Sequence, residues 1–116
     1  MRHKEESLQA ACVKWFDLQY PKLRLRLHHS PNGGKRNLIE AARFKAMGVR
    51  AGFPDLILLV PKGQCPFLGI ELKASKGRQS EAQKAYQEEF ERMGAKYVVI
   101  RSVEEFIQVV NDYIRS

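Results

Sequence analysis

The stretch FPDLILLVPKGQCPFLGIELKA, residues 53–74, decides the expected fold. Two apolar runs flank a loop, residues 61–66, that contains two prolines and one glycine. Proline and glycine interrupt strands and form turns, so we expect a β-hairpin with strands near residues 55–60 and 67–73. Both strands are almost continuously apolar, which predicts a central place in a sheet that is covered on both faces.

Charged residues mark the open end of this hairpin. Asp55 begins the first strand, and Glu71 and Lys73 end the second. Folding the hairpin about residue 64 places Asp55 opposite Lys73 and near Glu71, and side chains two apart on a strand share a face. Burying unpaired charges beside apolar neighbours is costly. Either a salt bridge with Lys73 or a divalent cation held by the carboxylates would compensate them, and the spacing leaves both interpretations open.

The segments on either side of the hairpin predict four helices and two further strands. Apolar residues at helical spacing, capping-box residues and terminal glycines indicate the helices. Alternation of leucine with basic residues indicates a strand at 23–27 with one buried and one basic face. The expected helices cover residues 4–19, 38–47, 80–93 and 102–114, and the last strand covers 96–101. This order describes one α/β domain, residues 1–116, in which helices flank a central mixed sheet of about four strands.

The charge balance points to an anionic partner. The 116 residues carry 20 Lys and Arg against 13 Asp and Glu, a net charge of +7. Such an excess favours nucleic acid as a partner, with a basic soluble surface as the simpler alternative. No apolar run is long enough to span a membrane, and the first residues lack the apolar core of a secretory signal, so we expect a cytoplasmic protein. Cys12 and Cys65 lack metal-ligand spacing and are interpreted as packing or loop residues.

Short motifs and longer segments together resemble a known nuclease family. Pro54-Asp55 followed by E-L-K at 71–73 resembles the PD-(D/E)XK nuclease motif. The wider sequence resembles the virus-type replication-repair nuclease (VRR-NUC) domain, and two segments resemble its phage-type stand-alone members. The VRR-NUC-like segments are GVRAGFPDLILL (48–59), FLGIELKASKGRQSEAQ (67–83) and GAKYVVIRSVEEF (94–106), and the phage-type segments are EESLQ (5–9) and PNGGKR (31–36).

The resemblance implies a fold, a reaction and partners. The fold is a restriction-endonuclease-like core, and the reaction is Mg²⁺-dependent (or Mn²⁺-dependent) hydrolysis of DNA phosphodiester bonds. Stand-alone members cut branched DNA, such as four-way junctions, as homodimers. The chain would then be an endodeoxyribonuclease of a bacterial or phage-infected cytoplasm, with no small-molecule cofactor and no membrane partner. Phe106, Val110 and Tyr113 on the last helix would form either the dimer interface or part of the core.

Two other functions remain open at this point. A non-catalytic DNA-binding subunit on the same fold would keep the basic surface without turnover. A flap nuclease or a restriction-type enzyme would keep the chemistry with a different substrate. A restriction-type enzyme normally needs extra elements that read bases in the major groove, and this chain is too short to hold many.

The matched motif assigns roles to the hairpin residues. Asp55 and Glu71 would hold the metal, together with the backbone carbonyl of Leu72. Lys73 would position the attacking water and stabilise charge on the scissile phosphate. Carboxylate and carbonyl oxygens are the ligands that magnesium prefers.

An acid from the first helix completes the metal site in the family. Glu5 of the E-x-x-L-Q pattern is expected to fill this place, with Glu6 as the alternative, because Glu5 lies closer to the apolar stripe. Gln83 matches the family glutamine that follows the E-x-K strand and should lie near the site. Each has a structural alternative: Glu5 near a helix start favours the macrodipole, and Gln83 completes a capping box with Ser80.

The resemblance and the net charge together predict contacts with DNA phosphates. Arg50 and the KGR loop flank the proposed site in sequence and are the first candidates, with solvated charges as the alternative. The glycines of the PNGGKR loop permit a close backbone approach. His28 and His29 are interpreted either as polar strand-end residues or as phosphate contacts. The predicted nucleic-acid-binding residues are Asn32, Gly33, Gly34, Lys35, Arg36, Arg50, Lys76 and Arg78, with Arg43 and Lys45 as further basic candidates.

Overall fold

A four-stranded sheet lies at the centre of the computed structural model, which describes residues 2–31 and 37–116. The strands follow chain order: β1 (Leu27–His29), β2 (Leu56–Leu58), β3 (Leu68–Leu72) and β4 (Lys96–Ile100). β1 pairs antiparallel with β2, β2 pairs antiparallel with β3, and β3 pairs parallel with β4. The expected α/β class is confirmed, because the sheet is mixed and the β2–β3 hairpin occupies its centre.

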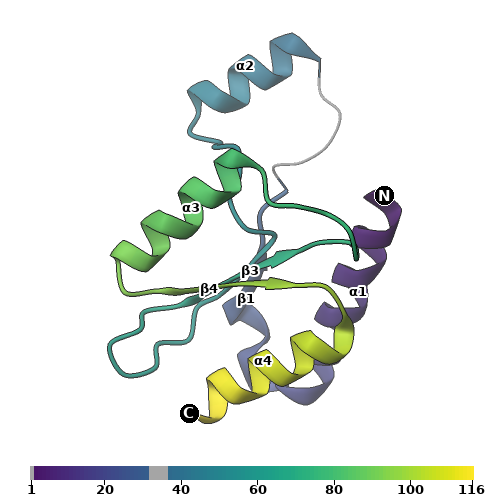
Figure 1. The fold of residues 1–116 in the computed structure, drawn as a ribbon, viewed down its shortest axis with the longest axis vertical. Coiled ribbons are helices and arrows are strands. Elements are labelled where there is room, and N and C mark those ends of the chain that lie inside the picture. Colours follow the sequence, from purple (N-terminus) through teal and green to yellow (C-terminus); the bar gives the residue numbers. More distant parts are fainter. Residues whose placement is uncertain (1, 32–36) are drawn as a thin grey trace.

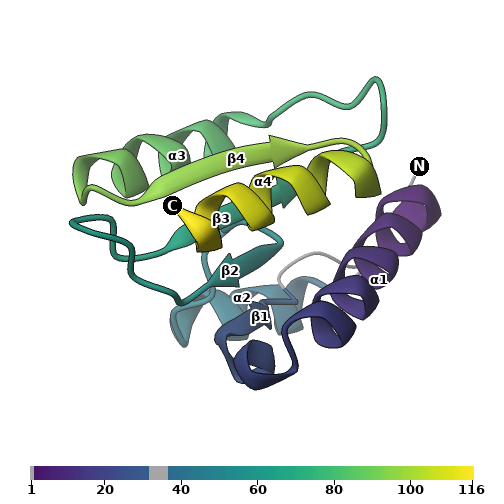
Figure 2. The same cartoon turned by 90° about the horizontal axis from the view of Figure 1, so that it is seen from below.

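Helices cover both faces of this sheet (Figure 1, Figure 2). α1 (Arg2–Gln19) and α4 (Val103–Arg115) lie on one face, and α3 (Glu81–Arg92) lies on the other. α2 (Leu38–Ala46) stands away from the sheet at one end of the molecule. All four helices agree with the sequence prediction to within two residues at either end. No helix in the described part of the chain is long and apolar enough to cross a membrane.

Side-chain caps begin the two helices that follow the hairpin. The Ser80 hydroxyl accepts a hydrogen bond from the Gln83 N–H, and the Gln83 side chain accepts one from the Ser80 N–H, so the expected capping box is present. The Ser102 hydroxyl caps α4 in the same way. The Glu105 carboxylate, however, accepts from the N–H of Arg101, one residue before the cap. The second box is therefore only half formed.

The hairpin register differs by two residues from the sequence prediction. Leu56 pairs with Ile70 and Leu58 with Leu68, so Glu71, and not Lys73, follows next in register with Asp55. A turn closes the hairpin at Lys62 and Cys65, where each residue donates its backbone N–H to the carbonyl of the other. This pair is one residue out of register with the strands, so one extra residue lies between the turn and β2. The acids at the open end are consequently closer to facing each other than the sequence suggested.

The strand predicted at 23–27 is wrong. Residues Pro21–Arg26 form a 3-10 helix, η1, and the strand begins only at Leu27. Pro21 has a φ angle suited to a helical start and no N–H to contribute to a sheet. The Leu23 N–H donates to the Tyr20 carbonyl, which closes the first turn. Leu25 is 97% exposed, so the alternating leucines do not form one buried face.

The main core lies between the sheet and the α1–α4 face. Its largest fully buried side chains include Phe16 of α1, Leu56 and Ile70 of the hairpin, and Phe106 of α4. Val110 and Tyr113, like Phe106, are buried in this cluster; the core alternative therefore holds for these last-helix residues. Cys12 is fully buried here, and burial raises the pKa of its thiol to about 12, so it behaves as a packing residue.

An aromatic cluster fills the opposite face, beneath α3. Phe90 is its centre, because Phe53, Phe67, Tyr86 and Tyr97 all pack edge-to-face against its ring. Gly69 of β3 lies directly below: a Cβ at this position would stand 2.5 Å from the Phe90 ring. The strand therefore needs glycine here for α3 to pack closely.

Candidate active site

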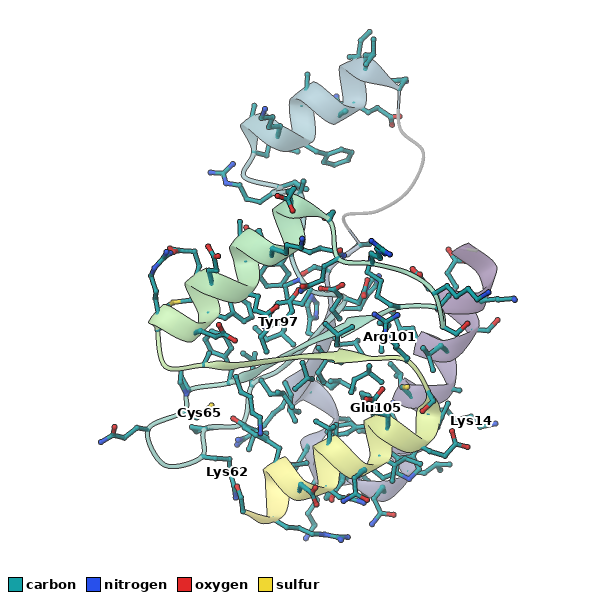
Figure 3. The ribbon with its side chains drawn as sticks, in the orientation of Figure 1. Lys14, Lys62, Cys65, Tyr97, Arg101 and Glu105 are labelled. Atoms are coloured by element: carbon teal, nitrogen blue, oxygen red, sulfur yellow. The ribbon has the colours of Figure 1, made fainter. Side chains whose placement is uncertain are left out.

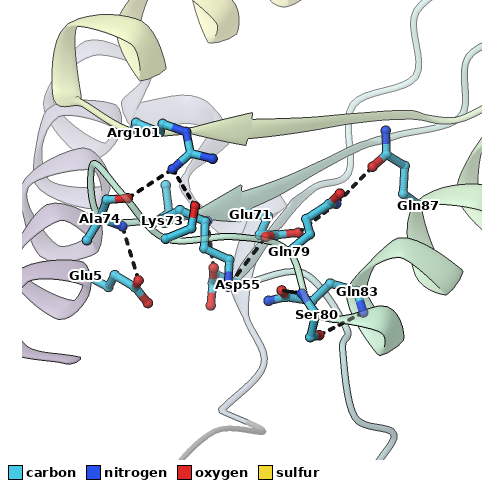
Figure 4. A network of polar contacts seen from close by, with 12 residues as sticks. Glu5, Asp55, Glu71, Lys73, Ala74, Gln79, Ser80, Gln83, Gln87 and Arg101 are labelled. Carbon is cyan, nitrogen blue, oxygen red and sulfur yellow. Dashed lines mark hydrogen bonds and ion pairs between the residues drawn. The ribbon is translucent and has the colours of Figure 1, made fainter. Parts of the chain in front are cut away.

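Four charged side chains from separate parts of the chain gather at the open end of the β2–β3 hairpin (Figure 4). Asp55 immediately precedes β2, Glu71 lies in β3, Lys73 follows β3, and Glu5 comes from the first turns of α1. Glu71 points to the α3 side of the sheet, where Tyr97 contacts it. The sequence-predicted acids and lysine are thus brought together by three elements.

Backbone groups hold Asp55 in place. Its Oδ2 accepts a hydrogen bond of 2.7 Å from the Leu72 N–H, and its carbonyl oxygen lies 2.7 Å from Nδ1 of His29. The pKa of the Asp55 carboxyl is raised, chiefly by burial; the Leu72 N–H opposes the shift, and the charges of Glu71 and Glu5 add to it. A positive charge at this point would favour the ionised form that these neighbours disfavour.

Glu71 is fully buried, and its two carboxylate oxygens have different environments. Oε1 accepts hydrogen bonds from the Tyr97 hydroxyl at 2.5 Å and from Nε2 of Gln79 at 3.2 Å. Oε2 has no hydrogen-bond partner among the described residues, and Nζ of Lys73 lies 3.7 Å away. That separation makes an ion pair but exceeds hydrogen-bond length. A buried charged oxygen without a hydrogen bond is unfavourable, so this atom is suited to bind a cation.

Glu5 connects α1 to the loop that follows β3. Its Oε2 accepts a hydrogen bond of 3.1 Å from the Ala74 N–H. The guanidinium of Arg101 holds the same loop from the other side, by donating to the carbonyls of Ala74 and Gly77 at 3.0 and 2.7 Å. Glu5 is half-buried in this network and Glu6 is exposed, which favours Glu5 as the helix-borne acid.

An open groove runs past these residues. It is about 1140 Å³ in volume, beyond the range of about 300–1,000 Å³ usual for small-molecule pockets. α1 contributes one wall, including Glu5 and Glu6, and the other wall includes Asp55 and Gln83. Gly52 shapes this second wall: its φ is +89°, and a Cβ there would lie 2.5 Å from the Ala82 carbonyl carbon at the start of α3. The size and openness of the groove suit a polymer.

Comparison with known proteins assigns the family. The family model described as "VRR-NUC domain" matches residues 2–104 of the chain. The chain belongs to the VRR-NUC family. A solved structure described as a VRR_NUC domain protein is similar to it over 97% of this chain and 88% of that one, with 34% sequence identity and a TM-score of 0.84. A search of curated proteins found no match. The family is of nuclease type, and the mixed sheet flanked by helices is its fold.

The site of this VRR-NUC chain has the donor atoms that a hard divalent cation prefers. No three His, Cys, Asp or Glu side chains within residues 2–31 and 37–116 stand in a ready metal-binding arrangement. Asp55 Oδ2 and Glu5 Oε2 each accept a hydrogen bond from a backbone N–H. Glu71 Oε2 has no such bond. An all-oxygen donor set of this kind fits magnesium or manganese, with Asp55 and Glu71 as the nearest ligands.

The structure describes only some of the predicted DNA-binding residues. Arg50, Lys76 and Arg78 are exposed on the segments that flank the VRR-NUC site. Arg43 and Lys45 are exposed on α2, and His28 is exposed on β1, whereas His29 contacts the Asp55 backbone. The remaining predicted residues, Asn32, Gly33, Gly34, Lys35 and Arg36, lie outside the described part of the chain.

The sequence predicts that Gln83 lies near the site, but it does not predict Gln79 and Tyr97, which contact Glu71. Gln83 forms the capping box and also lines the groove, so both of its interpretations agree with the structure. It is Gln79, however, that reaches Glu71, together with Tyr97. Tyr97 could have been found from the parallel register of β3 and β4, which pairs Val99 with Glu71 and so places Tyr97 on the same face. Gln79 lies in a loop, where no periodic signal exists.

Proposed function

We propose that the chain is a Mg²⁺-dependent endodeoxyribonuclease that hydrolyses phosphodiester bonds in branched DNA. The observation that carries this proposal is the meeting of Glu5, Asp55, Glu71 and Lys73 beside an open groove, with Glu71 Oε2 lacking a hydrogen bond. Membership of a nuclease-type family supports the reaction class. The net charge of +7 supports a polyanionic substrate.

Each site residue has a distinct task in this proposal. Asp55 and Glu71 would hold the cation, with Glu5 and the Leu72 carbonyl completing its ligands. The cation supplies Lewis acidity and an activated water when bound. Lys73, whose side chain is 14% exposed, would donate from its ammonium group to the water and to a non-bridging phosphate oxygen. This donation stabilises the charge that develops in the transition state.

Substrate binding is assigned to the exposed basic residues around the groove. Arg50, Lys76 and Arg78 would contact phosphates on both sides of the scissile bond, which positions the DNA without reading its sequence. Arg101 holds the loop that carries Lys76. A nuclease that recognises branch shape needs few base contacts.

A homodimer belongs to the same proposal, because two symmetric cuts at a junction need two sites. The α4 residues that sequence analysis considered for its interface are buried within the core. Three large apolar side chains are exposed on α2 and just after it: Leu38 is 89%, Ile39 79% and Met47 66% exposed. Leu18 and Leu25, on α1 and η1, are exposed to a similar degree. We propose that this α2 surface, defined by Leu38, Ile39 and Met47, forms the two-fold contact.

The test compares labelled four-way junction, flap and linear duplex DNA, each with Mg²⁺ and with EDTA. Wild type should cut the junction symmetrically in Mg²⁺ only, and should leave the duplex intact. Lys73→Ala should abolish cutting and keep binding, whereas Lys96→Ala, an exposed lysine at the start of β4, should behave as wild type. Tight junction binding without cutting by wild type, in Mg²⁺ or Mn²⁺, would establish the non-catalytic DNA-binding subunit instead. Cutting confined to flaps or to duplex sequences would favour the other nuclease alternatives.

A further inference from the structure

A chain of hydrogen bonds leads from the surface of α3 to the buried Glu71. Nε2 of Gln87 donates to Oε2 of Glu91 at 3.2 Å, one turn further along the helix. Oε1 of Gln87 accepts from Nε2 of Gln79 at 2.9 Å, and the same Nε2 donates to Oε1 of Glu71 at 3.2 Å. Figure 4 shows Gln79 between Gln87 and Glu71.

The chemistry of the two ends fixes the direction of this chain. An ionised carboxylate can only accept hydrogen bonds. Glu91 therefore turns the amide nitrogen of Gln87 toward itself, which leaves the Gln87 oxygen to face Gln79. Gln79 must then present its own nitrogen, which has one proton for Gln87 and one for Glu71. The amide of Gln79 is thereby held as a donor to the buried carboxylate.

Tyr97 adds a second donor to the same oxygen. Its hydroxyl lies 2.5 Å from Oε1 of Glu71, and its ring packs edge-to-face against Phe90 at 5.6 Å. Both donors converge on Oε1 and neither reaches Oε2.

We propose that Tyr97 and Gln79 are positioning residues that fix the plane of the Glu71 carboxylate, so that Oε2 faces Lys73 and accepts a divalent cation. This inference rests on the proposed function, since it concerns the same cation. The Gln87–Glu91 pair extends the role to the surface of α3, because it sets the orientation of the Gln79 amide. Loss of either donor lets the carboxylate rotate and use Oε2 for another partner.

The experiment measures Mn²⁺ binding to the DNA-free protein by electron paramagnetic resonance, alongside junction cleavage at a series of Mg²⁺ concentrations. Tyr97→Phe removes the hydroxyl and keeps the ring. Gln79→Leu removes the amide. Groups that orient metal ligands typically change metal affinity about 10- to 100-fold, so each variant should raise the Mn²⁺ Kd at least tenfold. Cleavage should recover at high Mg²⁺, with an unchanged KM for DNA.

Tyr86→Phe is the matched control, because Tyr86 packs against the same Phe90 ring, whereas the hydrogen bonds to Glu71 within the described residues come from Tyr97 and Gln79. It should bind Mn²⁺ as wild type does. A merely structural role for Tyr97 would lower Tm and leave the Mn²⁺ Kd within about twofold of wild type, and that result would overturn the inference alone. A wild type that neither binds Mn²⁺ nor cuts DNA would overturn the proposed function and the inference together. If the Tyr97→Phe protein fails to fold, Gln79→Leu, a change in the half-buried loop before α3, decides.

Discussion

Glu5 and Glu6 are neighbours in sequence with different surroundings. Glu5 is half-buried, binds the Ala74 N–H and acts electrostatically on Asp55, whereas Glu6 is exposed on the groove wall. The difference follows from helix geometry, because adjacent residues point about 100° apart around α1. Only one of the two can therefore complete a site centred on Asp55.

We predict that Glu5→Ala lowers junction cleavage at least tenfold, while Glu6→Ala stays within about threefold of wild type. The reason is that in the proposed site Glu5 would supply a cation ligand in addition to the bond that holds the 74–77 loop. The loss of a group that orients or binds a metal usually costs at least tenfold in metal affinity or activity. Initial rates at saturating DNA and limiting Mg²⁺ measure the effect. Equal losses in the two variants would show that the assignment to Glu5 is wrong.

Asp55 gives the site a pH-dependent contribution to stability. Its pKa in the folded protein is raised above an ordinary value of 3.8, so the folded state binds the proton more tightly than the unfolded state. The stabilisation is complete below pH 3.8 and is lost as pH rises through the folded pKa. At neutral pH the ionised carboxylate therefore destabilises the metal-free fold.

Asp55→Asn should accordingly raise Tm at about pH 7 in EDTA, and the difference from wild type should vanish at acidic pH. Asparagine stays neutral and its side-chain oxygen can still accept from the Leu72 N–H. Adding Mg²⁺ should stabilise wild type and leave Asp55→Asn nearly unchanged. Thermal melts across pH measure this, with Asp112→Asn on α4 as the control for losing an exposed carboxylate. A lower Tm for Asp55→Asn in EDTA at neutral pH would contradict the prediction.

At the scale of elements, local sequence signals predict the helices. Features that depend on long-range contacts are not predicted by these signals. Ser80 and Ser102 cap their helices as expected because capping is decided within four residues. The alternation of leucines does not predict the 3-10 helix at Pro21–Arg26, because that pattern takes no account of the backbone constraint that Pro21 imposes. A buried face needs a partner surface, and Leu25 has none in the described structure, where it is 97% exposed.

The site shows the same division. Asp55, Glu71 and Lys73 were found from the hairpin alone, since two strands joined by a short loop bring their ends together. The observed register differs from the predicted one by two residues, because Lys62 and Cys65 close the turn and one extra residue lies between this turn and β2. The spacing of the sequence reveals neither feature. The position of Tyr97 beside Glu71 depends on how β4 pairs with β3, and that of Gln79 depends on how the loop after β3 folds. Neither is a local property of the sequence.

α3 packs closely on β3 at Gly69. We predict that Gly69→Ala destabilises the protein by about 1–3 kcal/mol, because its Cβ would stand 2.5 Å from a Phe90 ring held in place by four other aromatic rings. Urea unfolding measures the change. Gly69→Ala combined with Phe90→Leu should cost less than the sum of the two single changes, since the smaller side chain makes room. Additive losses would show that the glycine serves another purpose.

At the scale of the whole molecule, α2 is the helix whose stability is least explained by packing within the single chain. It has nine residues, and isolated helices shorter than about 12–15 residues are marginal in water. It stands apart from the sheet in Figure 1 and in the side-chain view of Figure 3, and its Phe44 lines a hollow together with Phe53 and Tyr86. Asn37 caps it by accepting from the Glu40 N–H, but no residue of α2 is fully buried. A second copy that covers the α2 surface would remove its apolar side chains from water.

We therefore predict that Leu38→Ser combined with Ile39→Ser converts a wild-type dimer to a monomer, as measured by light scattering after size exclusion. The two side chains are 89% and 79% exposed in the single chain, so their replacement removes no packing within it, and Tm extrapolated to low protein concentration should change little. The monomer should still nick a junction on one strand but lose coordinated paired cuts, because each protomer carries a complete site. Leu25→Ser, an equally exposed leucine on η1, is the control and should leave the dimer intact. A double variant that stays dimeric would show that the two-fold contact lies elsewhere. A wild type that is monomeric and cuts flaps would show that the substrate is an asymmetric branch and not a four-way junction.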